Sequence, residues 1–330
     1  MSHVALQKFI GPVFIIGMPR SGTKLLRELL NGHSQISIPS GETSFLPYWI
    51  HHWQEYGDLS RPENFKQFYE TVIKFRYFVY MKEQDALISQ ATWFQTCRNF
   101  SVAGVFEALV RHDSDAAWET NIIWGDKSPA YIDHITLLKS VFPQSRFLHV
   151  IRDLRDYCLS VQKAWGKNPV RAAQRWADSV AQARQAGRQC GRDYLEIAYE
   201  ELLNQPETTI RNCCQWLELK FEPEMMHQLR SGNETIGDAK GYRSIKRDNS
   251  KKYLKQMSPI LLNRVEQITC ETLHQCGYET EYLGKVKRVS TGKMMFYKIL
   301  DAISLVRSEM KQRGLWDAIK LQWSSFYVSN

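Results

Sequence analysis

A short loop near the start of the chain carries residues suited to binding an anion. Residues 17–23 (GMPRSGT) join an apolar run, residues 12–17 (PVFIIG), to a stretch whose leucines recur at helical spacing. A loop at such a junction directs backbone N–H groups and the positive end of the helix at an anion. The Walker A pattern would place Lys directly after Gly22, but here Thr23 precedes Lys24. A nucleotide kinase or NTPase is therefore disfavoured and kept as an alternative.

Arg152 and Ser160 form a second candidate anion site. Arg152 directly follows an apolar stretch, residues 146–151 (RFLHVI), and Ser160 lies two turns into the helix expected next. A guanidinium fork and a hydroxyl donor can converge on one dianionic phosphate. The position after a buried strand, and the distance along the chain from the first loop, favour this interpretation over a surface arginine and an exposed serine.

The first loop and the second anion site resemble those of PAPS-dependent sulfotransferases, which use 3′-phosphoadenosine 5′-phosphosulfate (PAPS) as donor. Residues 19–26 (PRSGTKLL) look like the family's 5′-phosphosulfate loop, and the strand with Arg152 and Ser160 looks like its 3′-phosphate segment. Residues 199–203 (YEELL) resemble a further family segment near the nucleotide, although Tyr199 also suits a core position. The basic residues 246–255 resemble the C-terminal phosphate-contacting segment. The resemblance implies donor contacts by Arg20, Ser21, Gly22, Thr23, Lys24, Arg152, Ser160, Tyr199, Lys251 and Lys252, with Arg247 a further candidate.

Two more segments resemble the tyrosylprotein sulfotransferase and bacterial branch of this family. Residues 40–43 (SGET) are similar to a segment whose glutamate is the general base, which implies that role for Glu42. Residues 125–129 (GDKSP) are similar to a segment with a catalytic lysine, so Lys127, with Arg20, would stabilise the leaving phosphate. Asp126 either orients this lysine or caps the next helix, and the cap is favoured. The histidines at positions 33, 51, 52 and 134 stay rival bases, because the cytosolic small-molecule branch uses histidine.

The elements that must position these residues alternate between strand and helix. Strands are expected at residues 12–17, 36–38, 122–125, 146–151 and 195–199, and helices at 23–33, 129–138, 153–165, 170–190, 206–217 and 259–276. Asp153 is a candidate N-cap, with Asp156 in an imperfect capping box. Two or three helices are expected over residues 64–113, and a loop that closes over a site over 230–250. This order predicts a three-layer α/β fold with a central parallel sheet and a P-loop-like strand–loop–helix.

Composition and charge narrow the class of protein. The 330 residues are 43% hydrophobic and 24% charged, as in ordinary globular proteins, and the seven scattered cysteines predict reduced thiols rather than disulfides or a zinc site. We expect no metal cofactor. Because residues 1–11 lack the apolar core of a secretory signal and no apolar run could span a bilayer, a cytoplasmic location is expected.

The last segment of the chain carries most of the net charge of +8. Residues 285–330 contain nine Lys and Arg but only three acids, which argues against a nucleic-acid partner for the rest of the protein. We divide the chain into a sulfotransferase domain, residues 1–284, and a basic extension, residues 285–330. The extension is predicted to form two amphipathic helices over residues 294–326, broken near Gly314. Packing on the body or on a second subunit of a homodimer is favoured over peripheral membrane contact.

The expected partners are a nucleotide donor and a hydroxyl acceptor. Product release would leave 3′,5′-adenosine bisphosphate (PAP). The acceptor class stays open among carbohydrates, lipids, peptide tyrosines and small molecules, because the matched segments face the donor. A non-catalytic nucleotide-binding scaffold is the remaining alternative.

Overall fold

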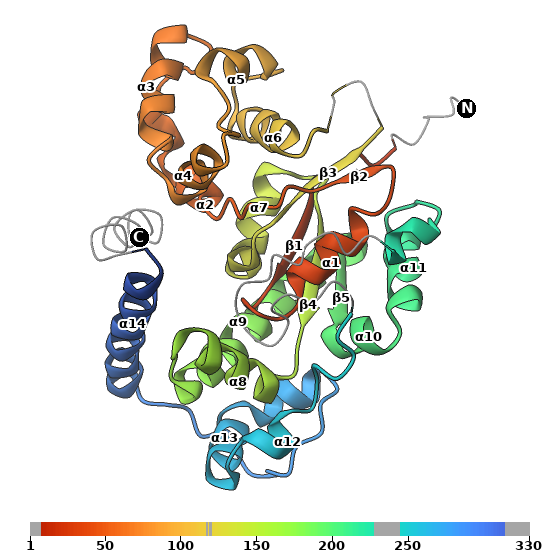
Figure 1. Ribbon diagram of the computed structural model, residues 1–330, viewed down its shortest axis with the longest axis vertical. Coiled ribbons are helices and arrows are strands. Elements are labelled where there is room, and N and C mark those ends of the chain that lie inside the picture. Colours follow the sequence, from red (N-terminus) through yellow and green to blue (C-terminus); the bar gives the residue numbers. More distant parts are fainter. Residues whose placement is uncertain (1–7, 117, 119–120, 228–244, 314–330) are drawn as a thin grey trace.

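The protein is built around a parallel sheet of five strands. The computed structural model describes residues 8–116, 118, 121–227 and 245–313. Within them the strand order is β2-β3-β1-β4-β5, and every neighbouring pair is parallel (Figure 1). The strands are β1 (Val13–Gly17), β2 (Ile36–Ser37), β3 (Ile123–Lys127), β4 (Arg146–Ile151) and β5 (Tyr194–Ala198). The predicted parallel sheet is confirmed, and β1 lies at its centre.

Alternate residues of β1 pack into two separate cores. Val13 and Ile15 face a core with leucines of α1 (Thr23–Leu30), together with α10 (Tyr199–Asn204) and α11 (Pro206–Trp216). Phe14 and Ile16 face the other core. That face is covered by η2 (Pro129–His134), α7 (Ile135–Val141), α8 (Leu154–Trp165), α9 (Pro169–Cys190) and α13 (Pro259–Gln275). Because successive strand side chains point to opposite faces, the all-apolar strand requires helices on both sides, which gives the three layers.

A group of helices rich in aromatic residues lies beside the sheet, above its β2 and β3 edge in Figure 1. Large side chains buried here, among them Trp49, Phe68 and Trp93, pack ring against ring. The expectation of two or three helices over residues 64–113 was too low, because Ser89 and Ser101 each cap a new helix that the aromatic spacing does not reveal. The group comprises α2 (Leu46–His52), η1 (Trp53–Tyr56), α3 (Pro62–Val72), α4 (Arg76–Glu83), α5 (Gln90–Thr96) and α6 (Val102–Asp113).

Near the predicted site, the structure differs from the sequence-based prediction at two points. Asp153 caps α8 as predicted, accepting a hydrogen bond from the Arg155 N–H, but Asp156 forms no capping box and accepts from the Tyr253 N–H instead. β3 continues two residues past Gly125 because residues 125–127 pair with β1. Asp126 therefore lies inside the strand, and its favoured role as a helix cap is wrong.

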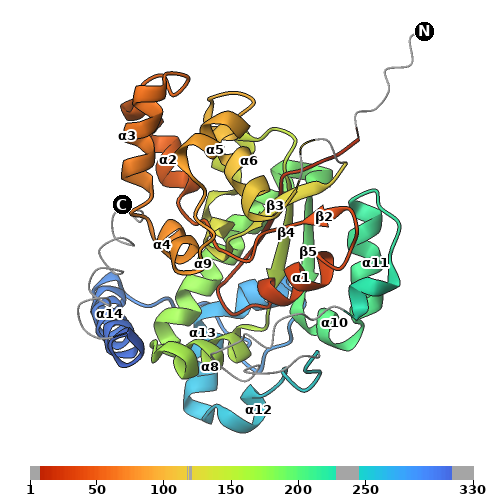
Figure 2. The same cartoon turned by 45° about the horizontal axis from the view of Figure 1, so that its top comes forward.

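The C-terminal part wraps back onto α8 and α9. After η3 (Gly191–Asp193), η4 (Pro223–Met226) and α12 (Tyr253–Gln256), α13 leads to the long helix α14 (Thr291–Arg313), seen at one edge of the molecule in Figures 1 and 2. The first helix predicted for the extension is thus present, and the second lies outside the described residues, as does most of the predicted loop at 230–250. Nowhere in the described ranges is a helix long and apolar enough to cross a membrane.

Candidate active site

The loop after β1 is shaped by two glycines. Gly17 has φ +153° and a Cβ there would lie 2.5 Å from the Val150 carbonyl oxygen. Gly22 is the N-cap of α1 with φ +102°, and its Cβ would lie 2.3 Å from the Tyr199 ring. An L side chain would therefore be both strained and obstructed at Gly22. The loop needs glycine here so that the backbone can turn into α1 beside Tyr199.

The side chains of this loop differ in their surroundings. Ser21 is buried, and its hydroxyl has no hydrogen-bond partner among the described residues. Thr23 is buried at the first turn of α1, and Lys24 is half-buried next to it. The Arg20 Nε lies 3.5 Å from the Ser160 hydroxyl, which joins the first predicted anion site to the second.

Arg152 holds the loop from the neighbouring strand. Its guanidinium is buried, donates 3.0 Å hydrogen bonds to the carbonyls of Arg20 and Asn249, and stacks 4.6 Å over the Tyr199 ring. The Nε of Arg152 has no partner among the described residues. A buried donor without a partner is costly, so this atom is well placed to meet an anion.

Arg20, Arg152 and Ser160 line one cavity of about 290 Å³ at the carboxyl ends of β1 and β4, whereas Tyr199 and the loop residues 21–24 are not among its lining residues. Lys252 lines it and donates a 2.6 Å hydrogen bond to the Asn249 side chain, whereas Lys251 is exposed and is not part of its wall. Asn249 also donates to the Tyr199 hydroxyl at 2.7 Å. The lining residues are Arg20, Arg152, Asp156, Leu159, Ser160, Gln162, Lys163, Asn249, Lys252 and Gln256.

Asn249 was missed by the sequence analysis. The only indication in the sequence is that Asn249 lies within the basic segment, residues 246–255, which was selected for its lysines and arginine. The side chain joins this segment to Tyr199 and so links residues fifty positions apart. Such a long-range contact depends on the fold and cannot be read from local spacing.

Glu42 and Lys127 meet at the edge of the sheet. The Lys127 Nζ lies 2.5 Å from the Glu42 Oε1; the lysine side chain is 5% exposed, while the glutamate side chain is 50% exposed. Lys127 ends β3 and Arg152 follows β4, and these two strands flank β1. The strand order therefore brings Lys127, the anion-binding loop and Arg152 to the same edge of the sheet.

A network of hydrogen bonds between hydroxyl groups lies next to Glu42 and Lys127. The Thr43 hydroxyl is 2.5 Å from the Tyr131 hydroxyl and 3.4 Å from that of Ser128. The Ser128 hydroxyl accepts from the Ser44 N–H, and the Tyr131 hydroxyl accepts from the Leu46 N–H. These bonds fix the segment that carries Glu42 to the turn after Lys127.

Asp126 is buried next to the same network. Burial raises the pKa of its carboxyl to about 7, although Ser128, Thr43 and Lys127 oppose the increase. Neither carboxyl oxygen has a well-aligned hydrogen bond among the described residues. Asp126 is thus a protonatable group directly beside the catalytic candidate Lys127.

The rival histidine bases have other contacts. The ring of His33 hydrogen-bonds the Lys220 carbonyl at 2.8 Å and the Gln35 N–H at 2.9 Å. His52 pairs with Glu55 at 2.8 Å. Burial lowers the pKa of His134, and nearby His51 adds to that effect. The hydrogen bonds of His33 and His52 favour structural roles for these two.

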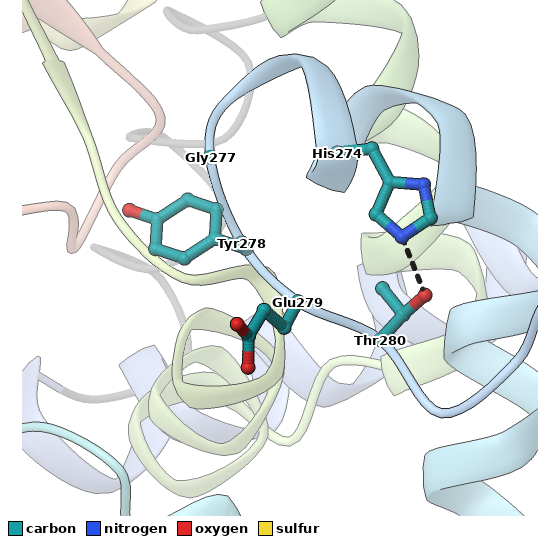
Figure 3. A pocket seen from close by; sticks show the side chains of 5 residues that line it. All are labelled: His274, Gly277, Tyr278, Glu279 and Thr280. Carbon is teal, nitrogen blue, oxygen red and sulfur yellow. Dashed lines mark hydrogen bonds between the residues drawn. The ribbon is translucent and has the colours of Figure 1, made fainter.

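Another hollow lies at the turn after α13 and holds none of the predicted residues. Figure 3 shows its lining, with the His274 ring 3.0 Å from the Thr280 hydroxyl. Tyr278 donates a 2.8 Å hydrogen bond to Glu200, which in turn accepts from the Asp153 N–H. These contacts tie the turn to the end of β4.

In the part of the chain that the structure describes, no group of three His, Cys, Asp or Glu is arranged to hold a metal ion.

Comparison with known proteins identifies the family. The model of the sulfotransferase family matches residues 12–223, more than half of the chain. The protein therefore belongs to the sulfotransferase family, as the motifs predicted. This membership argues against the kinase and NTPase alternative.

Several curated proteins resemble the chain at low identity. Protein-tyrosine sulfotransferase 1 of Danio rerio is 23% identical over 290 residues, which are 83% of this chain and 66% of that protein. A putative protein-tyrosine sulfotransferase of Caenorhabditis briggsae is 24% identical over 70% of this chain and 72% of its own length. An uncharacterised Aquifex aeolicus protein is 24% identical over 67% of this chain, but the match spans only 27% of that protein.

Solved structures show the same fold. The sulfotransferase domain of the Synechococcus PCC 7002 olefin synthase has a TM-score of 0.56 and 22% identity, covering 82% of this chain and 96% of that domain. The sulfotransferase domain from the curacin biosynthetic pathway has a TM-score of 0.55 and 22% identity, covering 83% and 99%. The P-loop-like α/β fold is thereby confirmed.

Proposed function

We propose that the protein transfers a sulfuryl group from PAPS to a hydroxyl group of an acceptor. Membership of the sulfotransferase family supports the reaction class. The observation that carries the choice of donor is the cavity where Arg20, Arg152 and Ser160 converge from the ends of β1 and β4. Two cations and a hydroxyl at the carboxyl edge of a parallel sheet suit a nucleotide with more than one anionic group.

The residues present fit the two anionic ends of this donor. Arg152, Ser160 and Lys252 would bind the 3′-phosphate, and the unpartnered Nε of Arg152 supports this. The loop after β1 would bind the 5′-phosphosulfate through Arg20, Ser21, Thr23 and Lys24. The buried Ser21 hydroxyl without a partner among the described residues supports that assignment.

Charge and proton transfer are assigned to three side chains. When bound, PAPS supplies an activated sulfuryl group and leaves as PAP. Glu42 accepts the proton of the acceptor hydroxyl, and its half-exposed carboxylate can be reached from solvent. Lys127 and Arg20 supply positive charge where the leaving phosphate becomes more negative. The Glu42–Lys127 contact places the proton acceptor next to a cation, so both groups are held where the transferring group would lie.

The acceptor is proposed only as a hydroxyl of a carbohydrate, lipid, peptide tyrosine or small molecule. Protein-tyrosine sulfotransferases among the relatives support including peptide tyrosines in the first screen. The half-exposed Glu42 is the point that such a hydroxyl must reach.

Sulfuryl transfer from labelled PAPS to a panel of these acceptors tests the proposal. Glu42→Gln should lower turnover by at least about 10²-fold, because a positioned general base contributes about that much. It should leave PAP binding intact. Glu63→Gln, an exposed glutamate on α3, is the matched control and should keep full turnover. Equal activity of the Glu42→Gln variant would show that another group is the base.

A further inference from the structure

The outer face of α14 is apolar and exposed. Among the described residues nine large apolar side chains are exposed, and five of them lie on this one helix. Phe296 and Ile299, for example, are 58% and 54% exposed. The five are Met295, Phe296, Ile299, Leu300 and Ile303. At 3.6 residues per turn this spacing puts them on one continuous face.

The opposite face of α14 is fixed to the body of the protein. Buried Asp301 accepts 2.7 Å hydrogen bonds from the Asn168 N–H and from the Arg171 guanidinium, at the start of α9. Tyr297 and Met294, one and two turns before Asp301, pack against the larger core. The helix is therefore anchored with its apolar face directed away from the sheet, at the edge of the molecule seen in Figures 1 and 2.

Cations border the exposed apolar face. On the helical wheel Lys298 lies along one edge of the face, and Lys293 and Arg307 lie along the other. All three are exposed. Among the described side chains of α14, Asp301 is the one acid, and it faces the body in an ion pair with Arg171. The outward surface formed by these side chains is thus apolar and positively charged.

We propose that α14 binds the surface of a bilayer that contains anionic lipids. Its apolar side chains would enter the boundary between headgroups and acyl chains, while the bordering lysines and arginine contact lipid phosphates and carboxylates. A second copy of the chain fits this face less well, because it would present the same cations. The positive charge of this surface therefore favours an anionic partner, and the width of its apolar face favours a lipid surface.

Sedimentation of the full-length protein with vesicles tests this proposal. Binding is expected to vesicles of phosphatidylcholine with about one third phosphatidylserine, and to weaken in high salt. Ile299→Asp should lower the affinity at least about tenfold, because it places a charge in the apolar contact. Leu283→Asp, which changes a side chain that is 86% exposed and lies outside α14, is the matched control and should bind as the wild type does. Lys293→Glu with Lys298→Glu should also lower affinity, about fivefold for each residue.

Three results would overturn the inference. The wild-type protein could stay in the supernatant with the phosphatidylserine-containing vesicles at low salt. Leu283→Asp could lose as much binding as Ile299→Asp, which would show a nonspecific charge effect. Light scattering could instead show a wild-type dimer that Ile299→Asp converts to a monomer with unchanged vesicle binding, which would make this face a contact between two copies of the chain.

Discussion

At the scale of single residues, the site depends on charges held at different depths. Lys127 is almost fully buried and its partner Glu42 is half-exposed, so the cation is fixed by the sheet while the carboxylate can be reached from solvent. The sequence around Glu42 and around Lys127 shows no apolar periodicity. Their pairing follows from the neighbouring places of β2 and β3 and from the hydroxyl network of Thr43, Ser128 and Tyr131.

Asp126→Asn should change how stability depends on pH. The ordinary pKa of this carboxyl is 3.8, and burial raises it to about 7 in the folded protein. Between these values the unfolded chain loses the proton while the folded protein keeps it, so rising pH favours unfolding. The free energy of unfolding of the variant minus that of the wild type should therefore rise from about pH 4 to about pH 7. The expected rise is a few kcal/mol, which is the free energy that a pKa difference of this size implies. It should then level off.

Denaturant unfolding of both proteins at several pH values measures this difference. A difference that stays constant from pH 4 to 8 would show that Asp126 is not a buried carboxyl with a raised pKa. Asp133→Asn, a change at a partly exposed aspartate on η2, is the control and should show no such rise.

Lys252 and Lys251 form a natural pair for a second test. Lys252 lines the cavity and contacts Asn249, whereas Lys251 is exposed outside its wall. Lys252→Ala should weaken PAP binding about tenfold, since it removes a cation next to the proposed phosphate site and a contact of Asn249. Lys251→Ala should change it less than about twofold. Calorimetric titration measures the dissociation constant of PAP for both variants. A larger loss of affinity for Lys251→Ala than for Lys252→Ala would contradict the assignment of Lys252 to the donor site.

At the scale of elements, the junction of β1 and α1 is the most demanding part of the fold. Gly22→Ala would meet both a left-handed backbone and the Tyr199 ring at 2.3 Å. We expect a loss of about 1–3 kcal/mol in unfolding free energy and weaker donor binding. Gly277→Ala separates these effects, because Gly277 has φ +79° with no atom within 4 Å of the added Cβ. Similar losses of stability for both variants in thermal melts would mean that strain alone, not contact with Tyr199, explains the effect.

The elements that the sequence predicts well are those with local signals. β4 is recovered at residues 146–151 because an apolar run ends at Arg152 and Asp153, and Asp153 caps α8. The end of β3 was missed because Asp126 and Lys127 are polar, and only backbone pairing with β1 extends the strand through them. Likewise, Tyr199 begins α10 rather than ending β5. Pairing partners and side-chain contacts such as Asn249 with Tyr199 come from the fold, which local patterns do not encode.

At the scale of the whole molecule, the strand order explains why distant motifs form one site. The loop after β1 lies between the ends of β3 and β4, so residues from three separated segments meet at one edge of the sheet. The division of the chain at residues 284 and 285 stays a prediction. The segment after it is not detached, since the Val289 N–H donates to Gln174 and Asp301 pairs with Arg171.

Thermal melting with PAP, ADP and ATP, without magnesium, tests the central claim most directly. At a hundredfold excess over its dissociation constant, PAP should add about 2.7 kcal/mol of stability, while ADP and ATP at equal concentration should add clearly less. Arg152→Ala should remove most of the PAP effect and leave any weak ADP effect unchanged. Stabilisation by ATP or ADP that equals or exceeds that by PAP, or an undiminished PAP effect in the Arg152→Ala variant, would contradict a PAPS site at Arg152.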